Sequence, residues 1–273
     1  MFREIKWVRK KNKFIDAHCH VSTRAYEEFH IQEIVAAAHY NNIEFFINNG
    51  GHPQENLEVI KLAKKYRVFK ACIGIHPEAG VDGNDYLLVK DLLDDNKENI
   101  IGIGEIGLDY YYEEAPTREN QIASFENQVK LAYDNNLPCV IHIRDKDNHD
   151  LAYQDVYNVL LKYPKLKCML HTFAGNLEWA KKFLDFPNLY FSFSGVVTFG
   201  SSTTTREVIE FLPLDRILNE TDAPFLRVHP YTGQKNEPNT VLYVYYYISG
   251  LKQVGLDKYV DRINKNVRKL FNL

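Results

Sequence analysis

Phe14-Ile15-Asp16-Ala17-His18-Cys19-His20 is a short apolar run that ends in two histidines one residue apart. On a β-strand, side chains at positions i and i+2 point to the same face, so His18 and His20 can offer two imidazoles to one point in space. Imidazole binds zinc, iron, nickel and copper, and a pair at this spacing supplies half of a metal site. A single His-x-His pair more often has no metal, so its meaning depends on the residues that end the other strands.

The composition indicates a large folded core. Of the 273 residues, 45% are hydrophobic and 13% are aromatic, which argues against disorder. There is no apolar run of about 18 residues and no signal-peptide pattern at the start, so we expect a cytoplasmic protein without a membrane segment. No Cys-x-x-Cys pair is present, which argues against disulfides and a zinc knuckle. We expect four buried thiols, at Cys19, Cys72, Cys139 and Cys168.

The charge is unevenly distributed along the chain. The net charge of −3 does not fit a protein that binds nucleic acid through a broad basic surface. Residues 1–13 contain six basic residues and one acidic residue, whereas the remaining 260 residues carry a net charge of −8. We expect 1–13 to form a basic leader, which is either a solvated terminus or an arm whose Trp7 and basic side chains contact phosphates.

Apolar strand-like runs alternate with segments of helical periodicity along the rest of the chain. Gln121–Tyr133 is the clearest helix, with Thr117 as its expected N-cap. Near-continuous apolar strands are typical of a parallel sheet with both faces buried. Eight strand-plus-helix units predict an α/β fold, a TIM-type (β/α)8 barrel formed by one domain, 14–273; a doubly wound open sheet is the alternative. The expected strands are Phe14–Ala17, Ile43–Asn48, Val68–Ile75, Ile100–Ile103, Pro138–Ile143, Leu166–Leu170, Leu189–Phe193 and Arg216–Leu218.

Catalytic residues of such barrels lie at the C-terminal ends of the strands. Histidine or a carboxylate follows six of the eight expected strands. A metal site at this end of the barrel would account for that concentration. Six of these residues have the chemistry to share two metals: His18, His20, Glu105, His142, His171 and Asp222.

A carboxylate can bridge two ions because each of its oxygens can face one of them. Glu105 is expected just after the fourth strand, where Gly104 and Gly107 allow close approach of the backbone. Asp222 precedes Ala-Pro and is expected to bind metal, although it could instead cap a helix.

Three more residues are expected to support the site. His76 ends the third strand and is a candidate for substrate contact. Arg144 carries a guanidinium fork that suits phosphate oxygens, but it could pair with Asp145 instead. Asp16 precedes His18 by two residues and could orient a ligand through a hydrogen bond.

In combination, six motifs resemble the TatD family of metal-dependent deoxyribonucleases, which belongs to the amidohydrolase-like barrels. The resemblance extends from about Phe14 to Phe271. The motifs are Asp16-Ala17-His18-Cys19-His20, Gly74-Ile75-His76-Pro77, Gly104-Glu105-Ile106-Gly107-Leu108-Asp109-Tyr110, His142-Ile143-Arg144-Asp145, Ser192-Phe193-Ser194-Gly195 and Asn219-Glu220-Thr221-Asp222-Ala223-Pro224. Two residues depart from the family pattern: Thr172 stands where cysteine is usual, and Lys235 where arginine is usual. The basic leader before Phe14 is an addition to that pattern.

The resemblance implies a TIM-type barrel with two divalent ions. His18, His20 and Asp222 would bind one ion, His142 and His171 the other, and Glu105 would bridge them. It also implies hydrolysis of DNA phosphodiester bonds, typically as a 3′-to-5′ exonuclease. Our own hypothesis for the mechanism is attack by a metal-activated water, with Asp222 placed to accept the proton of that water. We expect a monomer that uses magnesium, manganese or zinc and acts on DNA, with RNA as an alternative.

Two other enzymatic functions remain open from the sequence. Related barrels hydrolyse C–N or ester bonds with the same ligand types, and a small phosphoester is another candidate substrate. Many of those relatives bridge their metals with a carboxylated lysine, so a glutamate at position 105 with Arg144 beside the site favours phosphodiesters. A binding protein with a purely structural metal is the non-enzymatic alternative, although structural zinc sites are usually closed and four-coordinate.

Overall fold

Strands and helices alternate through the described part of the chain. The computed structural model describes residues 13–79, 83–147 and 149–273, so the predicted basic leader lies almost entirely outside the described residues. The strands are β1 Phe14–Cys19, β2 Ile43–Asn49, β3 Phe69–Ile73, β4 Ile100–Asp109, β5 Cys139–Arg144, β6 Cys168–Leu170, β7 Leu189–Phe193 and β8 Ile217–Asn219. The helices are α1 Glu28–Tyr40, α2 Pro53–Lys65, α3 Tyr86–Asn96, α4 Arg118–Asp134, α5 Leu151–Leu161, α6 Leu177–Phe183, α7 Thr203–Phe211, α8 Val241–Leu251 and α9 Leu256–Phe271, with short 3₁₀ helices η1 Gly195–Thr198, η2 Leu214–Arg216 and η3 Pro238–Thr240.

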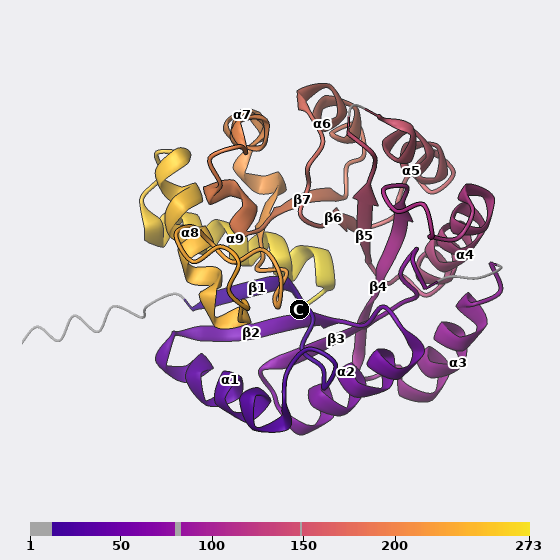
Figure 1. Cartoon of the computed structure of the whole chain (residues 1–273), viewed down its shortest axis with the longest axis horizontal. Helices are drawn as coiled ribbons and strands as arrows, with labels where there is room; N and C mark the ends of the chain where they lie inside the picture. The colour runs from indigo at the N-terminus through magenta and orange to yellow at the C-terminus, as the bar shows by residue number, and fades with distance from the viewer. Residues whose placement is uncertain (1–12, 80–82, 148) are drawn as a thin grey trace, which may run out of the picture.

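The eight strands form one parallel sheet in sequence order, from β1 to β8. The two outermost strands meet just beyond their C-terminal ends: the His20 amide donates to the Ala223 carbonyl at 2.7 Å, and the Asp222 amide donates to the His18 carbonyl at 3.0 Å. The sheet therefore closes, and the helices surround it, with α8 and α9 completing the ring next to β1 (Figure 1). This confirms the predicted TIM-type barrel and excludes the open sheet.

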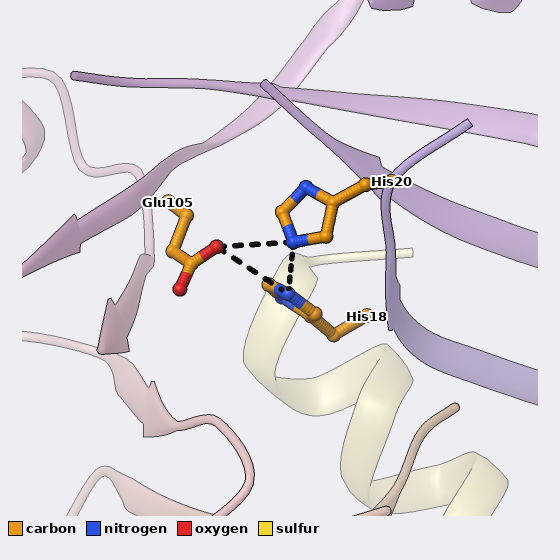
Figure 2. A group of neighbouring side chains, drawn as sticks. All are labelled: His18, His20 and Glu105. Carbon is orange, nitrogen blue, oxygen red and sulfur yellow. Dashed lines mark hydrogen bonds and ion pairs between the residues drawn. The ribbon is translucent and has the colours of Figure 1, made fainter. Parts of the chain in front are cut away.

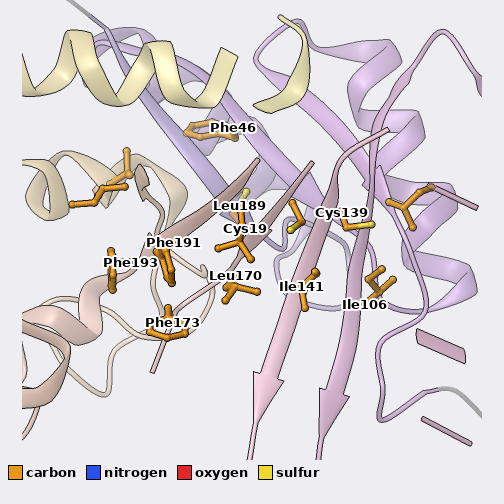
Figure 3. Packing of buried hydrophobic residues seen from close by; sticks show 14 of the residues in the cluster. Cys19, Phe46, Ile106, Cys139, Ile141, Leu170, Phe173, Leu189, Phe191 and Phe193 are labelled. Carbon is orange, nitrogen blue, oxygen red and sulfur yellow. The ribbon is translucent and has the colours of Figure 1, made fainter. Parts of the chain in front are cut away.

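Two apolar clusters pack against the opposite faces of the sheet. The inner cluster takes alternate side chains from the strands, such as Val140 of β5, and is joined by Leu270 and Phe271 of α9. The outer cluster takes the intervening side chains, such as Cys139 and Ile141, and packs them against the helices (Figure 3). The two-residue period of β-strands produces this division. The polar side chains lie beyond both clusters, at the C-terminal ends of the strands.

All four cysteines are free and buried, as the sequence predicts. Burial raises the pKa of each thiol, so these side chains are inert packing groups. Cys19 belongs to the outer cluster and its sulfur lies 3.6 Å from the Ile47 carbonyl oxygen.

Strand β4 is longer than predicted. The expected run, Ile100–Ile103, ends before the glycines, but the strand continues to Asp109 and pairs with β5 at Ile106 and Gly107. A Cβ atom on Gly107 would lie 2.0 Å from the His142 carbonyl oxygen, and its φ of +147° disfavours other residues. Glu105 therefore lies inside a strand, not after one.

Helix α4 begins at the predicted cap. The Thr117 side chain accepts a hydrogen bond from the Asn120 amide, so the helix begins at Arg118, three residues before the predicted start. None of the helices among the described residues is both long and apolar enough to cross a membrane.

Candidate metal centre

Glu105 lies between two pairs of histidines at the C-terminal end of the barrel. Its Oε2 atom is 3.1 Å from Nε2 of His20 and 3.6 Å from Nε2 of His18 (Figure 2). Its Oε1 atom is 2.8 Å from Nε2 of His171 and 3.0 Å from Nδ1 of His142. Each carboxylate oxygen thus faces one pair, which is the arrangement expected of a bridging carboxylate.

Asp222 closes the His18 side of the cluster. Its Oδ1 atom lies 3.4 Å from Nε2 of His18 and 3.5 Å from Nε2 of His20. No helix begins at this residue, so the helix-capping alternative is wrong. Burial raises the pKa of Asp222, but hydrogen bonds with His18 and His20 outweigh burial and hold the pKa well below its ordinary value.

The outer nitrogens of three of these histidines face hydrogen-bond acceptors. His20 Nδ1 lies 3.1 Å from the Asn49 carbonyl oxygen, and His142 Nε2 lies 3.0 Å from Oδ2 of Asp109. His171 Nδ1 lies 3.3 Å from Oε1 of Glu220. An acceptor at the outer nitrogen holds the ring proton there, so the inner nitrogen turns its lone pair toward the centre of the cluster.

The cluster therefore needs a cation at its centre. The inner nitrogens of His18 and His20 lie 3.0 Å apart, as do those of His142 and His171, and both pairs face a carboxylate. Lone pairs and anionic oxygens repel one another at these distances unless protons or metal ions lie between them. The donor set of imidazoles and carboxylates fits a divalent ion.

The pKa shifts of the cluster residues also indicate that positive charge stabilises the cluster. Burial lowers the pKa of His20, but hydrogen bonds with Asp222 and Glu105 outweigh burial and raise it to about 10. Burial also lowers the pKa of His171, yet the charge of Glu105 raises it well above its ordinary value. For Glu105 itself, burial raises the pKa, but His171 and His76 outweigh burial and bring it well below the ordinary range.

His76, expected as a substrate contact, lies against Glu105. Its Nε2 atom is 3.5 Å from Oε1 of Glu105, and its Nδ1 atom accepts a hydrogen bond from the Glu78 amide at 3.3 Å. A backbone amide only donates, so neutral His76 carries its proton on Nε2. His76 thus presents an N–H to the site, whereas His20, His142 and His171 each present the lone pair of a ring nitrogen.

Arg144 contacts two tyrosines that follow β4 and does not pair with Asp145. Its guanidinium lies 3.9 Å from the centre of the Tyr111 ring and donates to the Tyr112 hydroxyl at 3.0 Å. Asp145 accepts hydrogen bonds from the backbone of Lys146 and Ala152. The expected Arg144–Asp145 pair is not formed.

Asp16 contacts the backbone of His18 and both the backbone and the side chain of Thr221, but no imidazole ring. Its Oδ1 atom accepts from the amides of His18, at 3.2 Å, and Thr221, at 2.9 Å, and its Oδ2 atom accepts from the Thr221 hydroxyl. Asp16 therefore ties the end of β1 to the end of β8, next to Asp222.

Asp109 and Glu220 also contact the cluster, although no sequence pattern predicted a role for them. Asp109 lies four residues after Glu105 at the end of β4, and Glu220 two residues before Asp222. Both are buried and both contact the outer nitrogen of a histidine. Each of the two motifs contains a second carboxylate, and that pattern in the sequence could have indicated a residue that orients a histidine.

The two departures from the family pattern lie outside the cluster. The Thr172 hydroxyl and amide donate to Oε1 of Glu220 at 2.5 and 2.7 Å. The Lys235 ammonium donates to the Ala25 carbonyl and lies 5.0 Å from the centre of the Tyr26 ring. Thr172 supports a residue that orients His171, whereas Lys235 joins two loops.

Comparison with known proteins agrees with this geometry. The family model of TatD-related DNases matches residues 15–272. This chain belongs to the TatD family. It is 32% identical over 262 residues to YabD of Bacillus subtilis, named a metal-dependent hydrolase, with 94% of this chain and 98% of the relative covered. YcfH of Escherichia coli, also named a metal-dependent hydrolase, is 32% identical over 265 residues, with 95% and 96% covered.

A solved structure shows the same fold. The TatD homologue YjjV of Escherichia coli superposes with a TM-score of 0.84 at 26% identity, covering 96% of this chain and 99% of YjjV. The TatD-family chain described here is thus a metal-dependent hydrolase of the TatD type, with histidines and carboxylates grouped where a metal ion would bind.

Proposed function

We propose that this TatD-family hydrolase cleaves phosphodiester bonds of DNA as a 3′-to-5′ exonuclease that uses two divalent ions. The observation that carries the proposal is the position of Glu105, whose two oxygens face two separate histidine pairs. His18, His20 and Asp222 would hold one ion, His142 and His171 the other, and Glu105 both. When bound, such ions act as Lewis acids toward a phosphoryl group and lower the pKa of water.

The protein's own groups would position and polarise the substrate. Asp222 presents a buried carboxylate that is ionised at neutral pH because its pKa is low. We propose that it takes up the proton of the water. His76 presents an N–H beside Glu105, suited to donate to a phosphoryl oxygen as negative charge develops there. Arg144 supplies a fixed positive charge two residues beyond His142.

Magnesium, manganese and zinc all remain candidates for the ions. Imidazole nitrogens favour zinc or another transition ion, whereas carboxylate oxygens also suit magnesium and manganese. The site combines both ligand types, which supports use of more than one divalent ion.

The decisive experiment offers single-stranded DNA with one end blocked. The full chain is freed of metal, supplied with magnesium, manganese or zinc, and given oligonucleotides whose last linkages are phosphorothioates at either the 3′ or the 5′ end. We expect a 5′-blocked strand to be shortened stepwise and a 3′-blocked strand to persist. The reverse pattern would contradict the polarity.

Two controls separate this function from its alternatives. Glu105→Gln, purified in the same way, should be inactive, which excludes a contaminating nuclease, whereas Glu98→Gln, at an exposed glutamate before β4, should match the wild type. Hydrolysis of p-nitrophenyl acetate or p-nitrophenyl phosphate without cleavage of any DNA would instead support an ester or small-phosphoester hydrolase.

A further inference from the structure

Helix α4 packs against β4 (Figure 1) and carries two buried glutamines on one face. Gln121 and Gln128 lie seven residues apart, which is about two turns of helix, so their side chains point in the same direction. Neither is more than 3% exposed. A buried carboxamide destabilises a fold unless it is hydrogen-bonded, so its partners indicate its role.

Gln121 pairs with both polar backbone groups of Asp109. Its Oε1 atom accepts from the Asp109 amide at 2.8 Å, and its Nε2 atom donates to the Asp109 carbonyl at 2.9 Å. Nε2 also donates to the Pro116 carbonyl at 2.9 Å. The carboxamide thus uses both of its N–H groups, and it fixes one residue of the main chain at two points.

Gln128 makes the same pairing with Ile75. Its Oε1 atom accepts from the Ile75 amide at 2.8 Å, and its Nε2 atom donates to the Ile75 carbonyl at 3.1 Å and to the Ser124 hydroxyl at 3.2 Å. The Ile75 carbonyl belongs to the peptide bond that leads into His76. Gln128 therefore fixes the main chain directly before that histidine.

Both pairings lie where the strands have ceased to pair with each other. Strand β3 ends at Ile73, and β4 pairs with it only up to Ile103. Within a sheet the neighbouring strand satisfies the N–H and C=O groups of the main chain. A carboxamide has one donor group and one acceptor group, so it can replace that neighbour beyond the end of the strand.

Two buried asparagines make the same pairing at nearby strand ends. The Asn48 side chain bonds the amide and the carbonyl of Val21, next to His20. The Asn56 side chain bonds the amide and the carbonyl of Gly74. The pairing recurs beside the cluster, which indicates that it serves to place the residues that follow the strands.

The two glutamines reach the centre through different residues. Oδ2 of Asp109 lies 3.0 Å from Nε2 of His142, whose Nδ1 lies 3.0 Å from Oε1 of Glu105. Nε2 of His76 lies 3.5 Å from the same oxygen of Glu105. Both lines of contact therefore converge on one atom of the bridging carboxylate.

We infer that Gln121 and Gln128 are positioning residues of the metal centre, and that they act on different parts of it. Gln121 acts through Asp109 and holds His142 in place to bind an ion. Gln128 acts through Ile75 and holds His76 in place to donate to the substrate. One helix thus sets the spacing between a metal ligand and a hydrogen-bond donor. This inference rests on the ion binding of the proposed function, and its first measurement needs no DNA.

The test replaces each glutamine by glutamate in the full chain. A carboxylate has the same size but cannot donate, so the bond to the backbone carbonyl is lost. Zinc affinity is measured by competition with a chelator, and the visible absorption spectrum of the cobalt-loaded protein reports the ligand geometry. Hydrolysis of single-stranded DNA gives kcat and KM.

The two variants should differ from each other. We expect Gln121→Glu to weaken zinc binding about tenfold and to change the cobalt spectrum, because the support of His142 is displaced. Gln128→Glu should leave zinc affinity and the cobalt spectrum unchanged and lower kcat on the order of tenfold, because His76 is misplaced. A general loosening of α4 would change both variants alike.

Three further variants control for stability and charge. Val129→Ala removes buried methyl groups from the same helix, so it should lower the midpoint of denaturant unfolding and leave zinc affinity unchanged. Gln154→Glu adds the same charge at an exposed position of α5 and should match the wild type. Gln121→Met removes the same hydrogen bonds without burying a charge, and it takes the place of Gln121→Glu if that variant does not fold.

The outcomes separate this inference from the proposed function. Unchanged zinc affinity in Gln121→Glu, or an equal loss in Gln121→Glu and either Gln128→Glu or Val129→Ala, would overturn the inference alone. Wild-type kcat in Gln128→Glu would overturn the role of Gln128. A loss of zinc affinity confined to Gln121→Glu, without DNA hydrolysis by the wild type, would support the role of Gln121 and overturn the proposed function.

Discussion

The two histidine pairs around Glu105 are held in different ways. On one side, His142 and His171 are each backed by a buried carboxylate, Asp109 and Glu220. On the other side, His20 is backed by a backbone carbonyl, and within the described chain His18 Nδ1 is buried without a hydrogen-bond partner.

One centre can therefore contain two metal sites of unequal affinity. A carboxylate behind an imidazole raises its basicity and fixes its ring more firmly than a neutral carbonyl does. We therefore expect the His142–His171 side to bind a divalent ion more tightly than the His18–His20 side.

The largest expected effect comes from removing what the two sides share. Glu105→Gln replaces the anionic oxygens that face both pairs, so we expect hydrolysis to fall on the order of 1000-fold. Metal analysis of the dialysed Glu105→Gln protein should show that the metal is lost from both histidine pairs. His171→Ala and His20→Ala should each lose metal at their own pair and keep it at the opposite pair. A Glu105→Gln protein that keeps its full metal content would contradict the bridging role.

A smaller effect should come from the carboxylates behind one pair only. Asp109→Asn and Glu220→Gln keep side-chain volume but remove charge, and we expect each to weaken metal binding about 10- to 100-fold. Asn49→Ala is the matched variant on the other side, because it keeps the carbonyl that His20 contacts. Titration with zinc and a competing chelator measures the zinc affinity of all three variants. An equal loss of affinity in the three would contradict the expected difference between the two histidine pairs.

Proton competition provides a third comparison. In the metal-free protein the pKa of His20 is raised to about 10, so this ring is protonated at neutral pH and must lose a proton before it binds an ion. Metal affinity should therefore rise as the pH approaches 10, by about tenfold per pH unit for each proton released. Calorimetry in two buffers of different ionisation enthalpy counts the protons, and an affinity independent of pH between 6 and 9 would refute this expectation.

The smallest effect concerns the residue that supports Glu220. Thr172→Val removes the hydroxyl that donates to Glu220 but keeps the backbone amide bond, so we expect a loss of about 1 kcal/mol in the free energy of unfolding. Thr172→Ser keeps the hydroxyl and is the control. Denaturant unfolding measures both, and equal stability of Thr172→Val and the wild type would show that the bond contributes nothing.

The sequence predicted the barrel and the residues of the cluster because both depend on local patterns. Alternating apolar runs and helices reveal the (β/α) units, and histidines at strand ends, such as His18 and His20, stand out against apolar residues. The end of β4 could not be predicted in the same way, since its glycines interrupt the apolar run while pairing with β5 continues the strand to Asp109.

Contacts between distant strands were harder to predict. Glu220 supports His171 from a different strand, 49 residues away, and no spacing within one motif reveals that contact.

The hydrogen bonds of Asp16 to Thr221 span 205 residues of sequence. They close the barrel beside Asp222, so the cluster is incomplete until the last strand has joined the first. Contacts of this span close a long loop, which costs conformational entropy. A chain in which β8 has not yet joined β1 lacks both Asp222 and the seam beside His18, so the complete centre exists only in the closed barrel.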